Sequence, residues 1–430
     1  MLGIIKTEKS FPEVLAEVQS VMAEKYAVLL SLPDLSERKE ELKNYIKKAL
    51  EDKKLTCQGM TQDSLIEALY KEMAEYSFLT NYLYNKEVEE ININRWNDIK
   101  VNYTDGSMRP AAERFRSPQH ALDVIKKLLR PSGMILDASQ PTVRGHLNGN
   151  IRITAYAPPV IDSDAGVAAS IRIVNPKQYG KRDLISFGTL TEEMYDFLLM
   201  CCLAKVSQGY AGEPGSGKTT LMSSIMEELL KIQPTFRLYT IENETREFNL
   251  VKTDTAGNVI NNVVHLVTRK SNDPKLDVSQ ENLLELCLTS NPNGICVAEM
   301  KSAEAFAAQE AARTGLLVLT TTHSNSAIGT YSRMGTLCRM KYNLEYEILY
   351  DLITEAFPIS VYAQLIPGTD KRRIIEIGEM TILPDRKRVF RSLWKYQAAS
   401  DSYQKVQPIS DFLRNKLRDG FIMEEEIARY

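Results

Sequence analysis

The sequence predicts an α/β protein with a mostly parallel sheet, preceded by a smaller α+β domain and a helical extension. From residue 181 onward, short apolar runs alternate with segments of helical periodicity, which is typical of parallel strands joined by crossover helices. Residues 87–174 instead combine short strand-like runs with one helix. The first 60 residues carry helical spacing of apolar residues with many lysines and glutamates between them.

The predicted domains are a helical extension at 1–60, an α+β domain at 61–180, the main α/β domain at 181–385 and a strand/helix tail at 386–430. The polar segment 176–184 contains proline and glycine and is the expected linker. Before this linker, helices are expected at 11–30, 35–50, 64–83 and 118–129, and strands on either side of 95–98 and at 142–147, 151–156 and 168–174.

In the main domain, residues 250–269 carry a turn at 254–258 between two strand-like arms, which predicts an inserted hairpin. Helices are expected at 190–204, 219–232, 282–289 and 302–314, strands at 236–242, 294–299, 316–322, 372–379 and 389–396, and a final amphipathic helix reaching residue 430.

The composition of the 430 residues is that of a soluble globular protein, with 43% hydrophobic and 25% charged residues. A formal net charge of -3 argues against a dedicated nucleic-acid binder. The six cysteines show no C-x-x-C spacing and the four histidines are scattered, so neither predicts a redox or metal site. No apolar stretch reaches transmembrane length, and we expect no signal peptide.

Residues 212–219 read G-E-P-G-S-G-K-T and match the P-loop pattern G-x-x-x-x-G-K-[ST]. The glycines allow a tight turn whose N–H groups point at an anion, Lys218 reaches the β/γ-phosphates, and the Thr219 hydroxyl suits Mg²⁺. A helix follows at once and adds its positive N-terminal end. The expected nucleotide-binding residues are Gly212, Glu213, Pro214, Gly215, Ser216, Gly217, Lys218, Thr219 and Thr220.

Three strand ends after the P-loop carry polar groups suited to phosphoryl transfer. The first ends in T-I-E-N-E-T-R-E and contains Glu242 and Glu247. The second ends in Glu299, which resembles a Walker B acid, and the third runs T-T-T-H-S-N-S and contains His323. Because the carboxyl ends of parallel strands meet at one edge of a sheet, we expect these groups beside the P-loop.

The chain resembles the secretion ATPase superfamily of type II secretion, type IV pili, Tad pili and type IV secretion. The resemblance lies in the order of P-loop, acidic box, A-E-M-K-S-A-E-A-F and T-T-T-H-S-N-S. Residues 135–159, I-L-D-A-S-Q-P-T-V-R-G-H-L-N-G-N-I-R-I-T-A-Y-A-P-P, resemble the N-terminal domain of Tad-type, CpaF-like members. The resemblance implies a RecA-like P-loop domain that hydrolyses ATP, with ATP and Mg²⁺ as the bound cofactors.

The same resemblance implies a role for each candidate residue. Lys218 and Thr219 would hold phosphates and Mg²⁺, and Glu299 would orient the water or the metal. His323 would sense the γ-phosphate or couple subunits. The remaining implied site residues are the Asp-box acids Glu242 and Glu247 and the nucleotide-directed arginines Arg152 and Arg172.

The family further implies a hexameric ring at the cytoplasmic face of the inner membrane, acting on a membrane platform or secretion-channel protein. The acidic box departs from the family, because Asn243 and Glu244 stand where an aspartate is usual. The strand before the P-loop, V-S-Q-G-Y-A, is also unusually polar for a central strand. Three alternatives stay open: a nucleic-acid translocase using the basic clusters 371–373 and 386–388, a conjugation ATPase, and a scaffold that binds ATP without hydrolysis.

Overall fold

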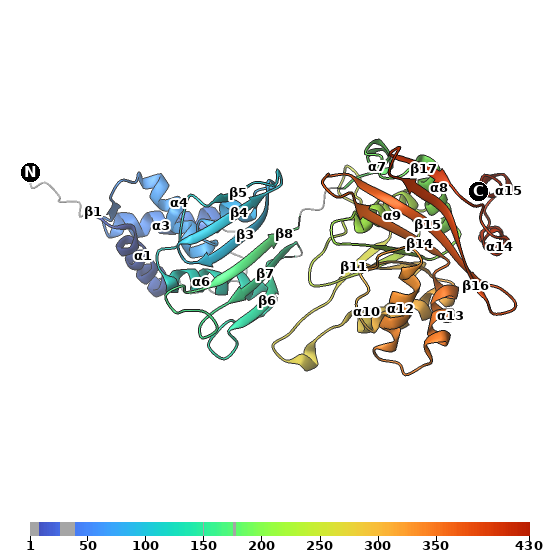
Figure 1. The fold of residues 1–430 in the computed structure, drawn as a ribbon. Helices are drawn as coiled ribbons and strands as arrows, with labels where there is room; N and C mark the ends of the chain where they lie inside the picture. The colour runs from blue at the N-terminus through green and yellow to red at the C-terminus, as the bar shows by residue number, and fades with distance from the viewer. Residues whose placement is uncertain (1–7, 26–38, 149, 175–177) are drawn as a thin grey trace, which may run out of the picture. The chain divides into compact units, whose positions relative to one another are not determined.

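The computed structural model describes residues 8–25, 39–148, 150–174 and 178–430. The chain divides into two compact units, Met1–Ile173 and Val174–Tyr430 (Figure 1). The division falls a few residues before the polar segment expected to be the linker, part of which forms the short helix α7 (Lys181–Ser186).

The first unit begins with a helical core. Helices α1 (Phe11–Lys25), α3 (Lys39–Asp52) and α4 (Gln62–Ala74) pack together, and two short strands, β1 (Glu8–Lys9) and β2 (Thr56–Cys57), pair in parallel. The helix expected at 64–83 is two helices, because Ser77, with φ of 57°, separates α4 from α5 (Leu79–Leu83). Parts of the helices expected at 11–30 and 35–50 lie outside the described residues.

A six-stranded antiparallel sheet completes the first unit, in the order β5-β4-β3-β8-β7-β6. Helix α6 (Pro118–Leu129), capped by the Ser117 side chain, packs on one face, where Ile125, Ile153 and Ile171 are fully buried. The strands are β3 (Val88–Arg95), β4 (Asp98–Tyr103), β5 (Met108–Pro110), β6 (Thr142–His146), β7 (Ile151–Tyr156) and β8 (Ala168–Ile173).

The second unit is built on a nine-stranded sheet in the order β11-β10-β12-β13-β9-β14-β15-β16-β17. The first six strands in this order run parallel, and β15, β16 and β17 continue the sheet antiparallel. The strands are β9 (Gln208–Gly212), β10 (Leu238–Glu242), β11 (Val263–Val267), β12 (Gly294–Val297), β13 (Leu317–Thr322), β14 (Ile359–Leu365), β15 (Arg372–Ile382), β16 (Arg388–Gln397) and β17 (Ser402–Lys405).

Helices cover both faces of this sheet, as parallel strands require. One hydrophobic core joins the sheet to α8 (Glu192–Leu203), α9 (Lys218–Ile232), α14 (Asp411–Asp419) and α15 (Glu424–Ile427). A second core, on the other face, joins it to α10 (Gln280–Leu288), α11 (Glu304–Arg313), α12 (Gly329–Arg339) and α13 (Tyr346–Ala356).

Three sequence-based expectations for the second unit differ in detail from the structure. The predicted inserted hairpin at 250–269 keeps one antiparallel bridge, Thr253 to Val259, but its second arm is β11, which pairs in parallel with β10 at the sheet edge. The single helix expected to reach residue 430 is two short helices, α14 and α15, separated at Gly420 and Phe421. The tail expected at 386–430 contributes β16 and β17 to the main sheet and so belongs to the second unit.

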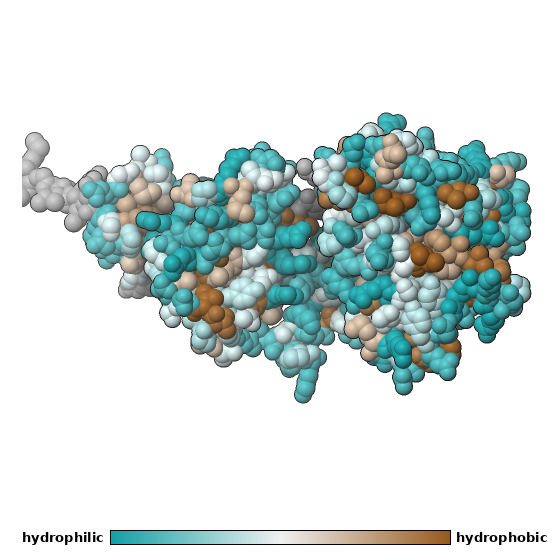
Figure 2. Space-filling model, in the orientation of Figure 1, coloured by the Kyte–Doolittle hydropathy of each residue, from teal (hydrophilic) through white to brown (hydrophobic). Residues whose placement is uncertain are grey.

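The visible surface is mostly hydrophilic, with small separate hydrophobic patches (Figure 2). Within the described ranges, every helix is too short or too polar to cross a bilayer. All six cysteines are buried free thiols, in agreement with the absence of C-x-x-C spacing.

Candidate active site

Residues 212–219 form the loop between β9 and α9, and its glycines adopt the backbone angles that the motif requires. The φ angle is 145° at Gly212, 77° at Gly215 and 93° at Gly217. A side chain at Gly212 would also collide with the backbone, since a Cβ there would lie 2.1 Å from the carbonyl oxygen of Ala363. Helix α9 begins at Lys218, so its positive N-terminal end faces the loop.

The unusually polar strand β9 is fully buried, and the side chain of its glutamine has hydrogen-bond partners. Gln208 Nε2 donates to the carbonyl oxygen of Leu198 at 2.8 Å, and Gln208 Oε1 accepts from the Tyr210 hydroxyl at 2.7 Å. Gly209 leaves room for Met334, whose Cε would lie 2.8 Å from a Cβ at that position. The composition of β9 therefore suits a central strand, because its amide has buried partners and its glycine admits a neighbouring helix.

The Lys218 side chain is directed into the loop. Its Nζ donates to the carbonyl oxygens of Gly212 at 2.8 Å and Glu213 at 2.7 Å. Burial lowers the pKa of Lys218, and the Glu299 and Glu213 carboxylates oppose this shift. A cation partly removed from water, and held by two neutral carbonyls, is suited to exchange them for anionic oxygens.

The residues of the loop fit a nucleotide phosphate and Mg²⁺. The Ser216 hydroxyl is buried and has no hydrogen-bond partner among the described residues, so it is available to an anionic acceptor. Within the same ranges, no three histidine, cysteine or acidic side chains are grouped to hold a metal. A magnesium ion would therefore need phosphate oxygens and water in addition to Thr219 and Glu299, as is usual for this metal.

Glu299 and His323 follow neighbouring strands and contact each other, and His323 also contacts the P-loop. His323 Nε2 lies 2.8 Å from Glu299 Oε1, and His323 Nδ1 lies 3.1 Å from the carbonyl oxygen of Gly212. Lys301 Nζ forms an ion pair with Glu299 Oε2 at 2.8 Å. The structure thus brings these two predicted site residues together with Lys218 around the loop.

Glu242, at the end of β10, is directed into the protein rather than toward the loop. Its side chain is 1% exposed, and its Oε2 accepts hydrogen bonds from the backbone N–H groups of Glu247 and Phe248, the latter at 2.9 Å. Burial raises the pKa of Glu242 to about 7. The Glu242 carboxylate therefore holds the turn at 243–248, and of the two predicted acids only Glu247 is exposed.

His265 on β11 is a site residue that the sequence analysis missed. It lies opposite Thr240 in the β10–β11 pair, with Nδ1 2.7 Å from Thr240 Oγ1 and 3.8 Å from Glu242 Oε1. Its Nε2 accepts from the Leu250 N–H at 3.4 Å, and burial lowers the pKa of His265 to about 4. Neutral His265 therefore links the inserted segment to the acidic turn.

The buried contact between Glu242 and His265 should govern how stability depends on pH. The pKa of Glu242 lies above its ordinary value of 4.5, so its stabilising contribution is largest at low pH and is lost as pH rises toward 7. The pKa of His265 lies below its ordinary 6.5, so its contribution is complete above pH 6.5 and is lost as pH falls toward 4. Each term is at most about 3 kcal/mol, and the two oppose each other.

Replacing either residue should therefore leave only the pH dependence of stability that the other residue causes. For Glu242→Gln we expect a free energy of unfolding that rises between pH 4.5 and 6.5, and for His265→Asn one that falls between pH 4.5 and 7. Urea unfolding across this range measures both. Glu247→Gln is the control for a neighbouring charge, because Glu247 donates its backbone N–H to Glu242 while its carboxylate adds only a smaller contribution to the raised Glu242 pKa, so its pH profile should stay close to that of the wild type. Parallel pH profiles for wild type and both variants would contradict the assignment.

Arg152 and Arg172 lie side by side in the first unit. They are direct partners in the β7–β8 pair. Their neighbours Ile153 and Ile171 point into the core, and alternation along the strands places the arginines on the opposite face. Arg172 is exposed and Arg152 is half-buried. The two predicted arginines therefore form a positive patch on the face of this sheet opposite α6, and Glu90 is the other strand neighbour of Arg172.

Acidic side chains neutralise much of the two basic clusters. Lys371 and Arg373 both pair with Asp401, at 2.9 and 2.8 Å. In the second cluster, Arg388 pairs with Asp351 at 2.6 Å. Paired cations are poor phosphate ligands, so these clusters give little support to nucleic-acid binding.

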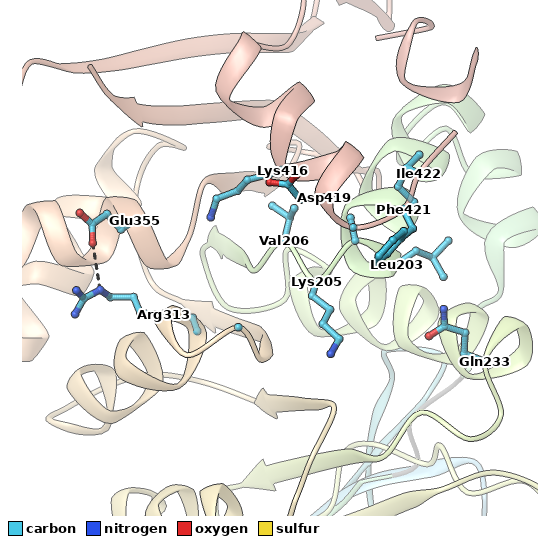
Figure 3. A pocket seen from close by; sticks show the side chains of 14 residues that line it. Leu203, Lys205, Val206, Gln233, Arg313, Glu355, Lys416, Asp419, Phe421 and Ile422 are labelled. Atoms are coloured by element: carbon cyan, nitrogen blue, oxygen red, sulfur yellow. Dashed lines mark hydrogen bonds and ion pairs between the residues drawn. The ribbon is translucent and has the colours of Figure 1, made fainter. Parts of the chain in front are cut away.

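A cavity of 990 Å³ lies at the opposite edge of the parallel strands from the P-loop (Figure 3). Its lining includes residues 203–206, just before β9, and Gly315, just before β13, whereas the P-loop follows β9. Arg313 and Glu355 form an ion pair on one side, at 3.2 Å, and Phe421, which is 94% exposed, lies on the other. This cavity is therefore separate from the cluster around Gly212.

Comparison with known proteins identifies the family. The family model described as type II/IV secretion system protein matches residues 73–357. "Uncharacterized protein MJ0900" of Methanocaldococcus jannaschii is 25% identical over 332 residues, covering 76% of this chain and 56% of that protein. Type IV secretion system protein PtlH of Bordetella pertussis is 32% identical over 195 residues, covering 44% of this chain and 54% of that protein. The chain spans little more than half the length of these curated relatives.

Among solved structures, the X-ray structure of the Legionella pneumophila ATPase DotB matches with a TM-score of 0.50 at 18% identity, covering 82% of this chain and 86% of that chain. At this identity the likeness concerns the fold, and it confirms the predicted class of an α+β domain followed by a RecA-like α/β domain. The family match includes the P-loop, Glu299 and His323 and extends over more than half of the sequence, so the chain belongs to the type II/IV secretion system protein family.

Proposed function

We propose that the chain is an ATP-hydrolysing motor of a type II or type IV secretion system or of a Tad-type pilus. The observation that carries this proposal is the cluster in which Lys218, Glu299 and His323 surround the start of the P-loop. Phosphoryl transfer needs positioned charges rather than covalent chemistry from the protein. The cluster supplies a cation, a carboxylate and an imidazole beside a backbone anion site.

In this proposal, the residues around the loop divide the tasks of the reaction among them. Lys218 binds the β/γ-phosphates of ATP in place of the carbonyl oxygens that it now contacts. Glu299 orients the attacking water and accepts its proton, and His323 positions the Glu299 carboxylate. Thr219 and Glu299 hold Mg²⁺, which when bound neutralises charge on the phosphates. Glu247 acts near the γ-phosphate, and Glu242 fixes the turn that carries it.

The positive patch formed by Arg152 and Arg172 supports a site completed by the N-terminal domain. We propose that these arginines neutralise charge on the nucleotide held by the P-loop, as arginine fingers do. Nucleotide binding and release would then move the two domains of each subunit in a ring, most simply a hexamer. The movement would act on an inner-membrane platform or secretion-channel protein from the cytoplasmic face. The similarity to PtlH supports secretion, and the sequence resemblance at 135–159 supports a Tad-type machine.

Replacing Arg172 tests the two-domain site. Arg172→Ala should lower the rate of ATP hydrolysis at least about tenfold, because the arginine's positive charge would no longer stabilise the transition state. Steady-state phosphate release measures the effect. Arg144→Ala is the matched control, since Arg144 is an exposed arginine on the same face of the same sheet.

Two outcomes would count against the proposal. Wild-type turnover in Arg172→Ala would reject the arginine's role. Strong stimulation of the wild-type chain by single-stranded or duplex DNA in the same assay would favour a nucleic-acid translocase instead.

A further inference from the structure

The P-loop has a neighbour outside the cluster described above: Arg372, the first residue of β15. Its Nε donates to the carbonyl oxygen of Gly215 at 2.9 Å. Its side-chain carbons cover Gly217, where a Cβ would lie 3.3 Å from the Arg372 Cδ. One side chain from a distant strand therefore contacts both inner glycines of the motif.

The start of β15 is held rigidly, so Arg372 projects from a fixed point. Buried Arg373 binds Asp401 through Nε at 2.8 Å and Nη2 at 3.1 Å, and Lys371 binds the same carboxylate at 2.9 Å. These donors hold the pKa of Asp401 well below its usual range. Because side chains alternate along a strand, Arg372 leaves β15 on the side opposite to its two anchored neighbours.

The contact with Gly215 fixes the orientation of a peptide bond that a phosphate would use. In a trans peptide the C=O and the following N–H point in opposite directions. With the Gly215 carbonyl held on the outside by Arg372, the Ser216 N–H points to the inside of the loop, where it donates to Glu213 O at 3.3 Å. Lys218 Nζ donates to the same Glu213 oxygen. The hydrogen-bond donors of the P-loop therefore lie on the inner side of the loop.

The strand before Arg372 supports the other end of the loop. Ala363 on β14 pairs in parallel with Gly212, and its carbonyl oxygen fills the space where a Gly212 side chain would be. The β14–β15 hairpin therefore contacts Gly212 through one strand and Gly215 and Gly217 through the other. It does so from the β14 side of β9, whereas Glu299 and His323 approach from the β13 side.

We propose that Arg372 is a positioning residue for the P-loop, which keeps the segment Gly215–Gly217 in its anion-binding conformation and so sets the affinity for nucleotide. The inference rests on the proposed function in that the ligand is a nucleotide, and it makes the antiparallel extension β14–β17 part of the nucleotide site.

The test is ADP affinity, measured by calorimetry with the full-length chain. Arg372→Ala should raise the dissociation constant for ADP about 5- to 10-fold, since one charge-assisted hydrogen bond and its packing are lost. KM for ATP should rise in proportion while kcat changes less than about threefold, because Arg372 touches no reacting group. Arg372→Lys, whose ammonium can reach the same carbonyl, should recover part of the affinity.

Arg386→Ala is the matched control, because Arg386 is an exposed arginine in the turn between β15 and β16, beyond the other end of β15. ADP affinity within twofold of wild type in Arg372→Ala would overturn the inference. So would equal losses in Arg372→Ala and Arg372→Lys with a matching drop in melting temperature, since the residue would then serve only the fold. A wild-type chain that binds ADP but does not hydrolyse ATP would defeat the proposed function and leave this inference standing.

Discussion

Glu299→Gln is expected to lower ATP turnover about 100- to 10,000-fold while leaving nucleotide affinity within a few fold of wild type. Glutamine keeps the size of the side chain and cannot accept the proton of an attacking water. The amide also lacks the charge that now attracts Lys301. A general base acts in the transition state and adds little to ground-state binding, so the loss should fall on kcat.

The measurement is steady-state phosphate release together with ADP and ATP titration of the same preparations. Glu355→Gln is the control, because Glu355 is also an ion-paired glutamate but lies beside the cavity at the opposite sheet edge. A kcat near wild type in Glu299→Gln would remove Glu299 from the reaction and would point to Glu247 as the water-orienting acid.

Lys218→Ala is expected to lower turnover about 100- to 1,000-fold and, unlike Glu299→Gln, also to weaken nucleotide binding. The reason is geometric. Lys218 Nζ is the buried cation inside the loop, held there by the Gly212 and Glu213 carbonyls. Without it, negative phosphate oxygens would face carbonyl oxygens with no positive charge between them.

Lys231→Ala controls for the loss of a lysine from the same helix, because Lys231 is exposed at the far end of α9 and pairs with Glu228. Unaltered thermal stability of Lys218→Ala would show that the change acts on the site alone. Nucleotide affinity equal to wild type in that variant would contradict the assigned role of Lys218.

The parts of the site that depend on a short stretch of sequence could be predicted. The glycine spacing of the P-loop reflects backbone angles within eight residues, and α9 follows from apolar periodicity. Glu299 and His323 were placed together because parallel strands end at one edge of a sheet. That rule holds whatever the length of the chain between them.

Features that depend on distant pairing could not be predicted. β10 is buried on both faces, so no alternation reveals which way Glu242 points at its end. His265 reaches Glu242 only because β11 pairs with β10, whereas the local turn at 254–258 favoured a hairpin. In the sequence, Arg372 belongs to the basic cluster 371–373, and only the return of β15 beside β14 brings it to Gly215.

The most direct test of the account is phosphate release from ATP by the purified wild-type chain, with and without Mg²⁺, compared with Lys218→Ala. We expect Mg²⁺-dependent release by the wild type and a loss of about 100-fold or more in the variant. Equal release from both proteins, or none from the wild type with Mg²⁺ present, would contradict it.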